Sequence, residues 1–241
     1  MEKLLKILRG RTNIVFFDLE GTQRTQEMIA IGAVSCSLNK DGTIKHIKPA
    51  FKRYVRSTTK VGEIVKNLTG INDQLLRQEG RSFYDTMVEF KKYVGLKWKK
   101  SLFVTYGTND LRILSQTNVH NIKSPLDICK QIQTNYFDFG GFINGYVKDD
   151  KYQTLSLVHL CELYNVELAT PAHDPAVDAI NLANVYNAFL TKLDITQREY
   201  KKVIVNNPKF PSSVRGVLKE LEKGNNVSPE MFDEEIKKEL K

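Results

Sequence analysis

A short, almost wholly apolar run at residues 13–19 (NIVFFDL) is the feature that most restricts how this chain folds. A strand buried on both faces has such an unbroken apolar run, so these residues are predicted to form a central strand of a sheet covered by helices. Asp18 and Glu20 stand at the end of the run. Because residues two apart on a strand point to the same face, both carboxylates are expected to project together.

The remaining pattern indicates strands in the first half of the chain and helices in the second. A turn signal, Lys40-Asp41-Gly42, separates two strand-like segments, so residues 13–54 are expected to form an antiparallel meander of three strands. The expected strands are 13–19, 27–38, 44–54, 101–106 and a short fifth at 124–128. The expected helices are 61–68, 71–77, 82–94 with a serine cap, one starting near Asp110, 154–164, 174–190, and two or three more in the tail. Residues 135–151, rich in glycine and aromatics, are expected to form a loop on the substrate side.

Length and composition predict one main domain. The chain has 241 residues, enough for a sizeable core, and it divides into a domain at 1–195 and a helical C-terminal extension at 196–241. No apolar stretch approaches the roughly 20 residues that a bilayer span needs, and the N-terminal segment lacks the features of a signal peptide. Three scattered cysteines favour a reducing, cytoplasmic setting over a disulfide framework or a zinc site.

The positive charge of the chain is concentrated near its N-terminus. The net charge is +8, and residues 1–60 hold twelve Lys or Arg against five acids, two of which are Asp18 and Glu20. The tail from Thr196 onward has ten basic and eight acidic residues, which is typical of a solvated helical surface. The basic bias therefore belongs to the segment that carries the first acidic pair, and it suits a polyanionic partner.

Two further blocks carry acidic residues. Asp110 follows the strand at 101–106 by a few residues, where it either reaches the same sheet edge as the first pair or caps a helix. Asp178 lies among apolar residues inside a helix, five residues after His173, and a carboxylate in such a place needs a partner, for which a metal ion is a good candidate. Oxygen-only ligands suit hard ions such as Mg²⁺ or Mn²⁺.

Together the three blocks, FDLEGT, TYGTNDLRIL and HDPAVDA, resemble the motifs of the DnaQ-like or DEDDh 3′–5′ exonucleases. The resemblance covers roughly residues 12–191 and is supported by the LTGI segment at 68–71 and by LDIC at 126–129. It implies an α/β, ribonuclease H-like fold with a central mixed five-stranded sheet, three antiparallel strands followed by two parallel ones. Helices flank this sheet, and the C-terminal tail is helical.

The resemblance also implies roles for individual residues. Asp18, Glu20, Asp110 and Asp178 become ligands of two divalent ions, Mg²⁺ or Mn²⁺, and His173 becomes the general base that accepts the proton of an attacking water. Gly21 and Thr22 become substrate-binding residues. Independently of the resemblance, Tyr106 is an aromatic residue near a strand end and is a candidate to bind substrate by stacking on a base. Gly21 and Thr22 are also explained as a turn, and Tyr106 as a core residue. Asp174, an extra acid beside His173, either repels substrate phosphate or acts in the first helical turn.

Two classes of function remain open at this stage. The first is an enzyme that removes nucleoside 5′-monophosphates from the 3′ end of single-stranded DNA or RNA. The second is a proofreading or regulatory protein that uses the same fold to bind a partner, with the C-terminal helices as a possible protein-binding surface. The complete set of five residues favours the enzyme, because a binding protein has no physical need for a costly carboxylate cluster.

Overall fold

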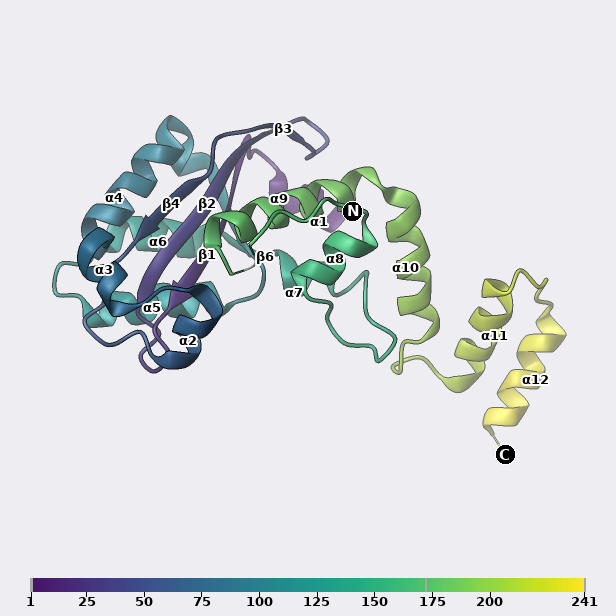
Figure 1. Ribbon diagram of the computed structural model, residues 1–241. Helices are drawn as coiled ribbons and strands as arrows, with labels where there is room; N and C mark the ends of the chain where they lie inside the picture. The colour runs from purple at the N-terminus through teal and green to yellow at the C-terminus, as the bar shows by residue number, and fades with distance from the viewer. Residues whose placement is uncertain (1, 172, 241) are drawn as a thin grey trace. The chain divides into compact units, whose positions relative to one another are not determined.

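The structure is a computed structural model that describes residues 2–171 and 173–240. These residues form two compact units (Figure 1). The first unit comprises Met1–Gly141 and Leu157–Thr191, and the second comprises Phe142–Ser156 and Lys192–Lys241. The predicted division into a domain at 1–195 and an extension at 196–241 refers to segments that fold independently of each other, and it stays a prediction.

A mixed sheet forms the centre of the first unit. Its strands run in the order β3-β2-β1-β5-β6, and β4 also pairs with β2. The bounds are β1 Asn13–Gly21, β2 Met28–Leu38, β3 Ile44–Ile47, β4 Phe51–Tyr54, β5 Ser101–Thr105 and β6 Tyr136–Asp138. The β1–β2, β2–β3 and β2–β4 pairs are antiparallel, whereas β1–β5 and β5–β6 are parallel. The predicted arrangement of antiparallel strands followed by two parallel ones is thus confirmed.

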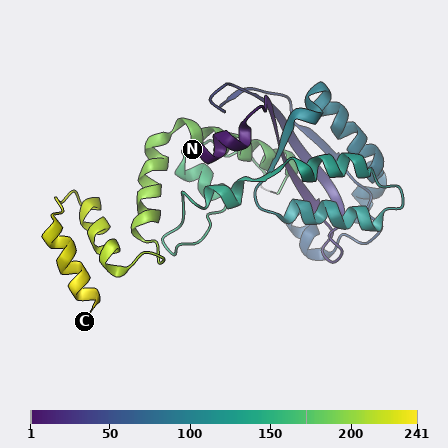
Figure 2. The same cartoon turned by 180° about the vertical axis from the view of Figure 1, so that it is seen from behind.

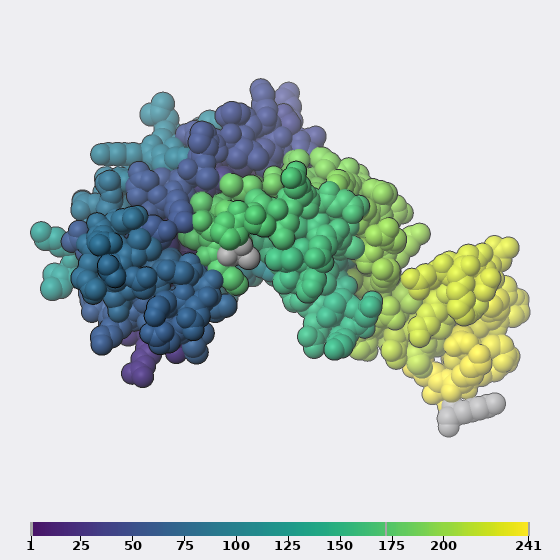
Figure 3. Space-filling view, in the orientation of Figure 1, coloured from purple at the N-terminus to yellow at the C-terminus, as the bar shows by residue number. Residues whose placement is uncertain are grey.

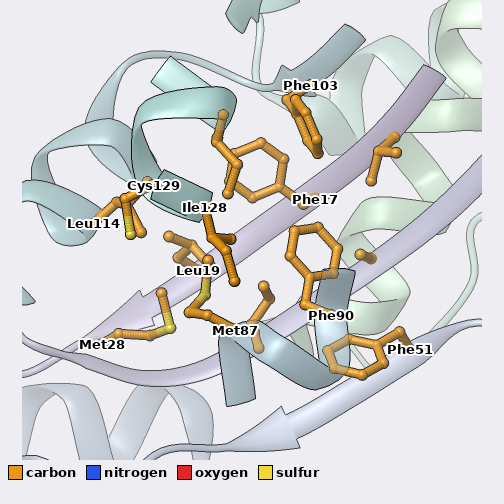
Figure 4. Packing of buried hydrophobic residues seen from close by; sticks show 14 of the residues in the cluster. Phe17, Leu19, Met28, Phe51, Met87, Phe90, Phe103, Leu114, Ile128 and Cys129 are labelled. Carbon is orange, nitrogen blue, oxygen red and sulfur yellow. The ribbon is translucent and has the colours of Figure 1, made fainter. Parts of the chain in front are cut away.

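Alternate residues of β1 face two different helical layers. Phe17 and Leu19 point into a hydrophobic cluster beneath α4 (Phe83–Val94), α5 (Asn109–His120) and α6 (Leu126–Thr134), where Phe17 meets Phe90 and Phe103 at ring-centroid distances of 6.4 and 6.5 Å (Figure 4). Seen from behind, α5 and α6, in teal, lie over this side of the sheet (Figure 2). Phe16 points the other way, toward Tyr186 of α9 (Pro175–Thr191), at 5.1 Å. Asp18 and Glu20 share the face of Phe16.

Local sequence explains where several helices begin. The Ser82 hydroxyl accepts the amide hydrogen bond of Asp85 at the start of α4, as the sequence predicts, and Asn72 caps α3 through the amide of Leu75. The remaining helices of the first unit are α1 Glu2–Leu8, α2 Glu63–Thr69, α3 Asp73–Glu79, the 3₁₀ helix Gly95–Lys100, and α8 Leu157–Leu163. Helix α7 (Phe139–Ile143) lies where the chain passes from one unit to the other.

The second unit is mainly helical. It contains α10 (Leu193–Val205), α11 (Ser212–Glu222) and α12 (Pro229–Glu239). The Tyr152 hydroxyl donates to the Val203 carbonyl at 2.9 Å, which fastens the 142–156 segment to α10. Helices α11 and α12 pack against each other. Among the described residues, no helix has both the length and the apolar character that a membrane span requires.

Three predictions about individual elements are wrong or need adjustment. The expected strand at 44–54 is two strands, β3 and β4, because Pro49, which has no amide hydrogen, falls between them. The expected fifth strand at 124–128 is wrong, since Pro125 precedes the first turn of α6, whose residues Ile128, Cys129 and Ile132 follow helical spacing. The fifth position in the sheet belongs to β6, so the predicted 135–151 loop is partly regular, containing β6 and α7.

Candidate active site

The end of β1 carries the first two carboxylates. Asp18 and Glu20 are both half-buried and lie on the face that α9 covers. The parallel pairing of β1 with β5 ends at Phe16 and Val104, so the backbone amide of Leu19 is no longer part of that ladder. It donates instead to the Asp110 carboxylate at 2.8 Å. The Asp110 side chain is therefore hydrogen-bonded to the backbone of Leu19, the residue between Asp18 and Glu20.

Asp110 is buried, with 5 % of its surface exposed, as the second residue of α5. An acid in the first turn of a helix is electrostatically favoured, and this one also reaches across to β1. The two interpretations of Asp110, helix-start acid and member of the acidic cluster, are thus both compatible with its position.

The third block lies at the start of α9. Asp178 is in the first turn of that helix, and the backbone amide of His173 donates a hydrogen bond to its carboxylate. His173 is exposed and has a φ of 61°, which a residue with a side chain rarely adopts. In the space-filling view the start of α9, in green, lies against the blue surface formed by the N-terminal part of the first unit (Figure 3).

The four carboxylates act on one another electrostatically. Burial, followed by the charges of Asp110, Glu20 and Asp178, raises the pKa of Asp18 well above its usual value. Burial and the charges of Asp178 and Asp110 raise the pKa of Glu20 to about 7. Burial also raises the pKa of Asp110 to about 7, although the Leu19 amide acts in the opposite direction. The structure therefore brings all four acids into one electrostatic cluster.

The charges of this cluster are not paired with lysine or arginine in the part of the chain that the structure describes. Among the residues that the structure describes, no Lys or Arg forms an ion pair with any of its four carboxylates. Crowded carboxylates without a compensating charge are costly, and a divalent cation removes that cost. Oxygen donors also suit a hard ion such as Mg²⁺ or Mn²⁺. The donor chemistry thus fits the metals that the resemblance implies.

The side chains are nevertheless not arranged as a ready-made metal centre. Across residues 2–171 and 173–240, no three acidic, histidine or cysteine side chains converge closely enough to hold an ion. The fit to a metal therefore rests on the kind of donors present and on their mutual effect on pKa values. The assignment of Asp18, Glu20, Asp110 and Asp178 as ligands remains a proposal.

Asp174 has a structural partner. Its Oδ1 accepts the Ala176 amide hydrogen at 3.0 Å, which caps α9, and its Oδ2 lies 2.7 Å from the Lys52 ammonium. The first-turn role considered for this acid is therefore present in the structure. The ion pair with Lys52 compensates the negative charge that an unpaired acid would present beside His173.

Gly32, in the middle of β2, is a site residue that the sequence reasoning missed. A Cβ atom built on Gly32 would lie 2.0 Å from the Ala176 nitrogen and from the Pro175 carbonyl carbon. The first turn of α9 therefore reaches its place only because this position has no side chain. A lone glycine inside an otherwise apolar strand was the available signal, since it often marks a close backbone approach.

The three predicted substrate-binding residues occupy different surroundings. A Cβ on Gly21 would meet Ile113 at 3.0 Å, so a glycine suits the packing of α5 there. Thr22 is 2 % exposed, and its hydroxyl accepts the amide hydrogen of Glu27 at 3.0 Å. Tyr106 is half-buried at the end of β5, where burial and then Asp138 raise its pKa to about 12. Contact of these residues with substrate stays a prediction.

Glu27 was not singled out from the sequence either. Its buried carboxylate accepts hydrogen bonds from the Thr58 amide at 2.8 Å and from the Thr59 hydroxyl at 2.7 Å. These bonds join the β1–β2 connection to the segment before α2. They therefore fix the loop that follows Glu20 in the chain.

The sequence matches a family profile described as "RNase_T: Exonuclease" over residues 15–186. The chain belongs to this exonuclease family. The match begins within β1 and ends within α9, so it includes all four carboxylates and His173. No curated protein matches the chain by sequence. The predicted family, the predicted fold and the predicted class of enzyme, an exonuclease, are confirmed.

Several solved structures share the fold of this exonuclease. Cell-death related nuclease 4 (CRN-4) aligns with a TM-score of 0.59 and 20 % identity, over 76 % of this chain and 65 % of its own. The nuclease domain of 3′hExo, a DEDDh family member bound to rAMP, aligns with a TM-score of 0.60 and 19 % identity, over 76 % and 93 %. E. coli ExoI in its zinc-bound complex with ssDNA aligns with a TM-score of 0.58 and 16 % identity, over 81 % and 44 %. This exonuclease therefore spans less than two thirds of CRN-4 and of ExoI.

Proposed function

We propose that this exonuclease hydrolyses nucleic acid from the 3′ end and releases nucleoside 5′-monophosphates, with two Mg²⁺ or Mn²⁺ ions as cofactors. The observation that carries the proposal is the cluster of four carboxylates delivered by β1, α5 and α9. All four have raised pKa values, and none forms an ion pair with Lys or Arg in the described part of the chain. Asp18, Glu20, Asp110 and Asp178 would hold the ions. Bound divalent ions supply Lewis-acid stabilisation of the charge that develops on a phosphodiester.

The protein's own groups account for the proton transfer. In the proposed reaction a water attacks phosphorus, the bond from phosphorus to the 3′ oxygen breaks, and a ring nitrogen of His173 takes the water's proton. The departing 3′ oxygen takes a proton from solvent and becomes the new 3′ hydroxyl. An imidazole accepts a proton near neutral pH, which makes it an effective general base. The exposed position of His173 supports this role, because the ring is accessible to water and to a substrate.

Single-stranded DNA or RNA is the proposed substrate. Among the fold relatives, the 3′hExo nuclease domain holds rAMP and ExoI holds ssDNA, which supports a nucleic acid and leaves both sugars as possible outcomes. The basic bias of residues 1–60 suits the same polyanion. We further propose a cytoplasmic location, in keeping with three buried free cysteines, and a protein partner at the C-terminal helices, where Leu221 and Phe232 are exposed.

Degradation of end-labelled oligonucleotides tests the proposal. With Mn²⁺ or Mg²⁺, a 5′-labelled single strand is expected to give a ladder that shortens from the 3′ end, and RNA and DNA are compared in parallel with their duplexes. Asp18→Asn and His173→Ala are expected to abolish the ladder. Glu79→Gln and His46→Ala, at exposed positions outside the cluster, serve as matched controls and should retain it. A folded wild-type protein that degrades none of these substrates with either metal would refute the proposal.

A further inference from the structure

One row of residues crosses the sheet from the carboxylate cluster to its edge. In the strand register Asp18 of β1 pairs with Gly32 of β2, and Gly32 pairs with Lys52 of β4. Directly opposed residues of neighbouring strands project to the same face. Asp18 and Lys52 therefore point to the α9 face on either side of Gly32, above which Pro175 and Ala176 lie.

Lys52 is joined to the segment that bears His173. Its ammonium lies 2.7 Å from Asp174 Oδ2, while Oδ1 of the same carboxylate accepts the Ala176 amide hydrogen at 3.0 Å. The Asp174 carbonyl also accepts the Asp178 amide hydrogen at 2.9 Å. The Asp174 side chain is 21 % exposed and that of Lys52 is 34 %, so both are shielded more than an ordinary surface pair. Asp174 thus connects Lys52 of β4 with Ala176 and Asp178 in the first turn of α9.

Three cations close to Lys52 in the sequence, Lys48, Arg53 and Arg56, are directed elsewhere. Arg53 points to the opposite face of β4 and pairs with Glu89 of α4 at 2.7 Å, and Lys48 donates to the Tyr93 carbonyl at 2.9 Å. Arg56 donates to the Gly80 carbonyl at 2.8 Å. Of these four, Lys52 is the one that reaches α9. Strand alternation explains the different direction of Arg53, because neighbouring residues of β4 face opposite sides of the sheet.

His173, next to Asp174 in the chain, has a backbone conformation that its surroundings must hold in place. Its φ of 61° lies in the left-handed region, which is strained for a residue with a Cβ and persists only where the surroundings hold it. The residue that follows His173 is the one that Lys52 holds. A general base also loses efficiency when it is misplaced by even about 1 Å.

We propose that Lys52 is a positioning residue, which acts through Asp174 to hold His173 and Asp178 in place for the reaction without touching the substrate. This inference rests on the proposed function of His173 and of the carboxylate cluster. It also explains why the acid beside His173 is tolerated, because Lys52 compensates its charge. Positioning of this kind affects turnover more than substrate affinity.

A double-mutant cycle tests the proposal. Lys52→Met and Asp174→Asn are each expected to lower kcat about tenfold with KM changed less than about twofold, and the double variant should lose no more than the worse single one. Lys52→Arg should restore most of the activity. Lys48→Met removes the same charge from the neighbouring part of the sheet edge and should leave kcat near that of the wild type.

A second measurement keeps this test separate from the test of the exonuclease itself. Amide hydrogen exchange is expected to speed up at Ala176 and Asp178 in Lys52→Met, but not in Lys48→Met, whether or not the protein is active. Unchanged exchange would overturn the proposal, as would a raised KM with an unchanged kcat, or losses that simply multiply in the double variant. An inactive wild type would instead refute the proposed function. The exchange rates would then still show whether Lys52 holds the first turn of α9 through Asp174.

Discussion

Replacing Gly32 by alanine is expected to disable the enzyme by moving the first turn of α9. The added Cβ would lie 2.0 Å from the Ala176 nitrogen and the Pro175 carbonyl carbon, whereas real Cβ contacts essentially never fall below 3.0 Å. The helix or the strand must therefore move by at least about 1 Å, and the opposing atoms are backbone, which has no rotamer to change. Asp178 and His173 move with the helix, away from Asp18.

Two magnitudes follow from this displacement. Overpacking of a core by one carbon costs about 1–3 kcal/mol of folding stability. For a protein of this size that corresponds to a fall in Tm of roughly 2 to 12 °C. A misplacement of about 1 Å in a catalytic group lowers the rate by about 100-fold. Gly32→Ala is therefore expected to remain folded at 20 °C and to lose most of its activity.

The assay compares kcat on a labelled single strand with thermal unfolding for the same preparations. Gly145→Ala is the matched control, because a Cβ there meets nothing closer than the Phe142 carbonyl oxygen at 3.3 Å and lies outside the site. The control should keep its activity. Wild-type kcat and Tm in Gly32→Ala would refute the reasoning that α9 is seated directly on β2.

Three further outcomes concern charge and metal. The pKa of Glu20 is raised from 4.5 to about 7, so its ionised form destabilises the metal-free protein progressively as pH rises between these values. Glu20→Gln should therefore increase the free energy of unfolding by at most about 3 kcal/mol at pH 8, and by much less at pH 5, with a matching rise in Tm. Equal effects at both pH values would contradict this. Burial acts to raise the pKa of Glu27, yet hydrogen bonds from Thr58 and Thr59 hold this pKa below its usual value. Glu27→Gln should therefore lower the free energy of unfolding, measured in urea at pH 7, by about 1–3 kcal/mol, and this difference should shrink as pH falls below about 4. A difference that is the same at every pH would contradict the role of these hydrogen bonds. Chelation with EDTA should stop hydrolysis, and Mn²⁺ should raise the Tm of the wild type but not that of Asp110→Asn; an equal rise in both would place the metal elsewhere.

The acidic cluster illustrates how far local sequence rules extend. The apolar run at 13–19 predicts β1, and the period of two places Asp18 and Glu20 on one face, because both properties depend on residues next to one another. The serine before α4 and the strand before Asp110 are local signals too. The order of the three blocks then identifies the family, and the match over residues 15–186 confirms it.

The edge strand shows where these rules fail. In residues 124–128 Leu126 and Ile128 flank a polar residue, as they would in a short strand, yet Pro125 and the helical spacing of the residues after it place the start of α6 there. The partner of β5 on the side away from β1 is instead a three-residue strand, Tyr136–Asp138, whose pairing is set by β5 and not by its own length or pattern. A strand this short has little propensity of its own, so its neighbours decide its structure.

The sequence by itself determined the central strand, the set of acids and histidine, and the family of the enzyme. Only the tertiary structure decided how the three blocks meet: the register that aligns Asp18, Gly32 and Lys52, the close approach of α9 at Gly32, and the ion pair from Lys52 to Asp174. The physical reason is that strand register and helix docking depend on contacts between residues far apart in the chain. Such contacts leave no periodic signal in the sequence around any one of them.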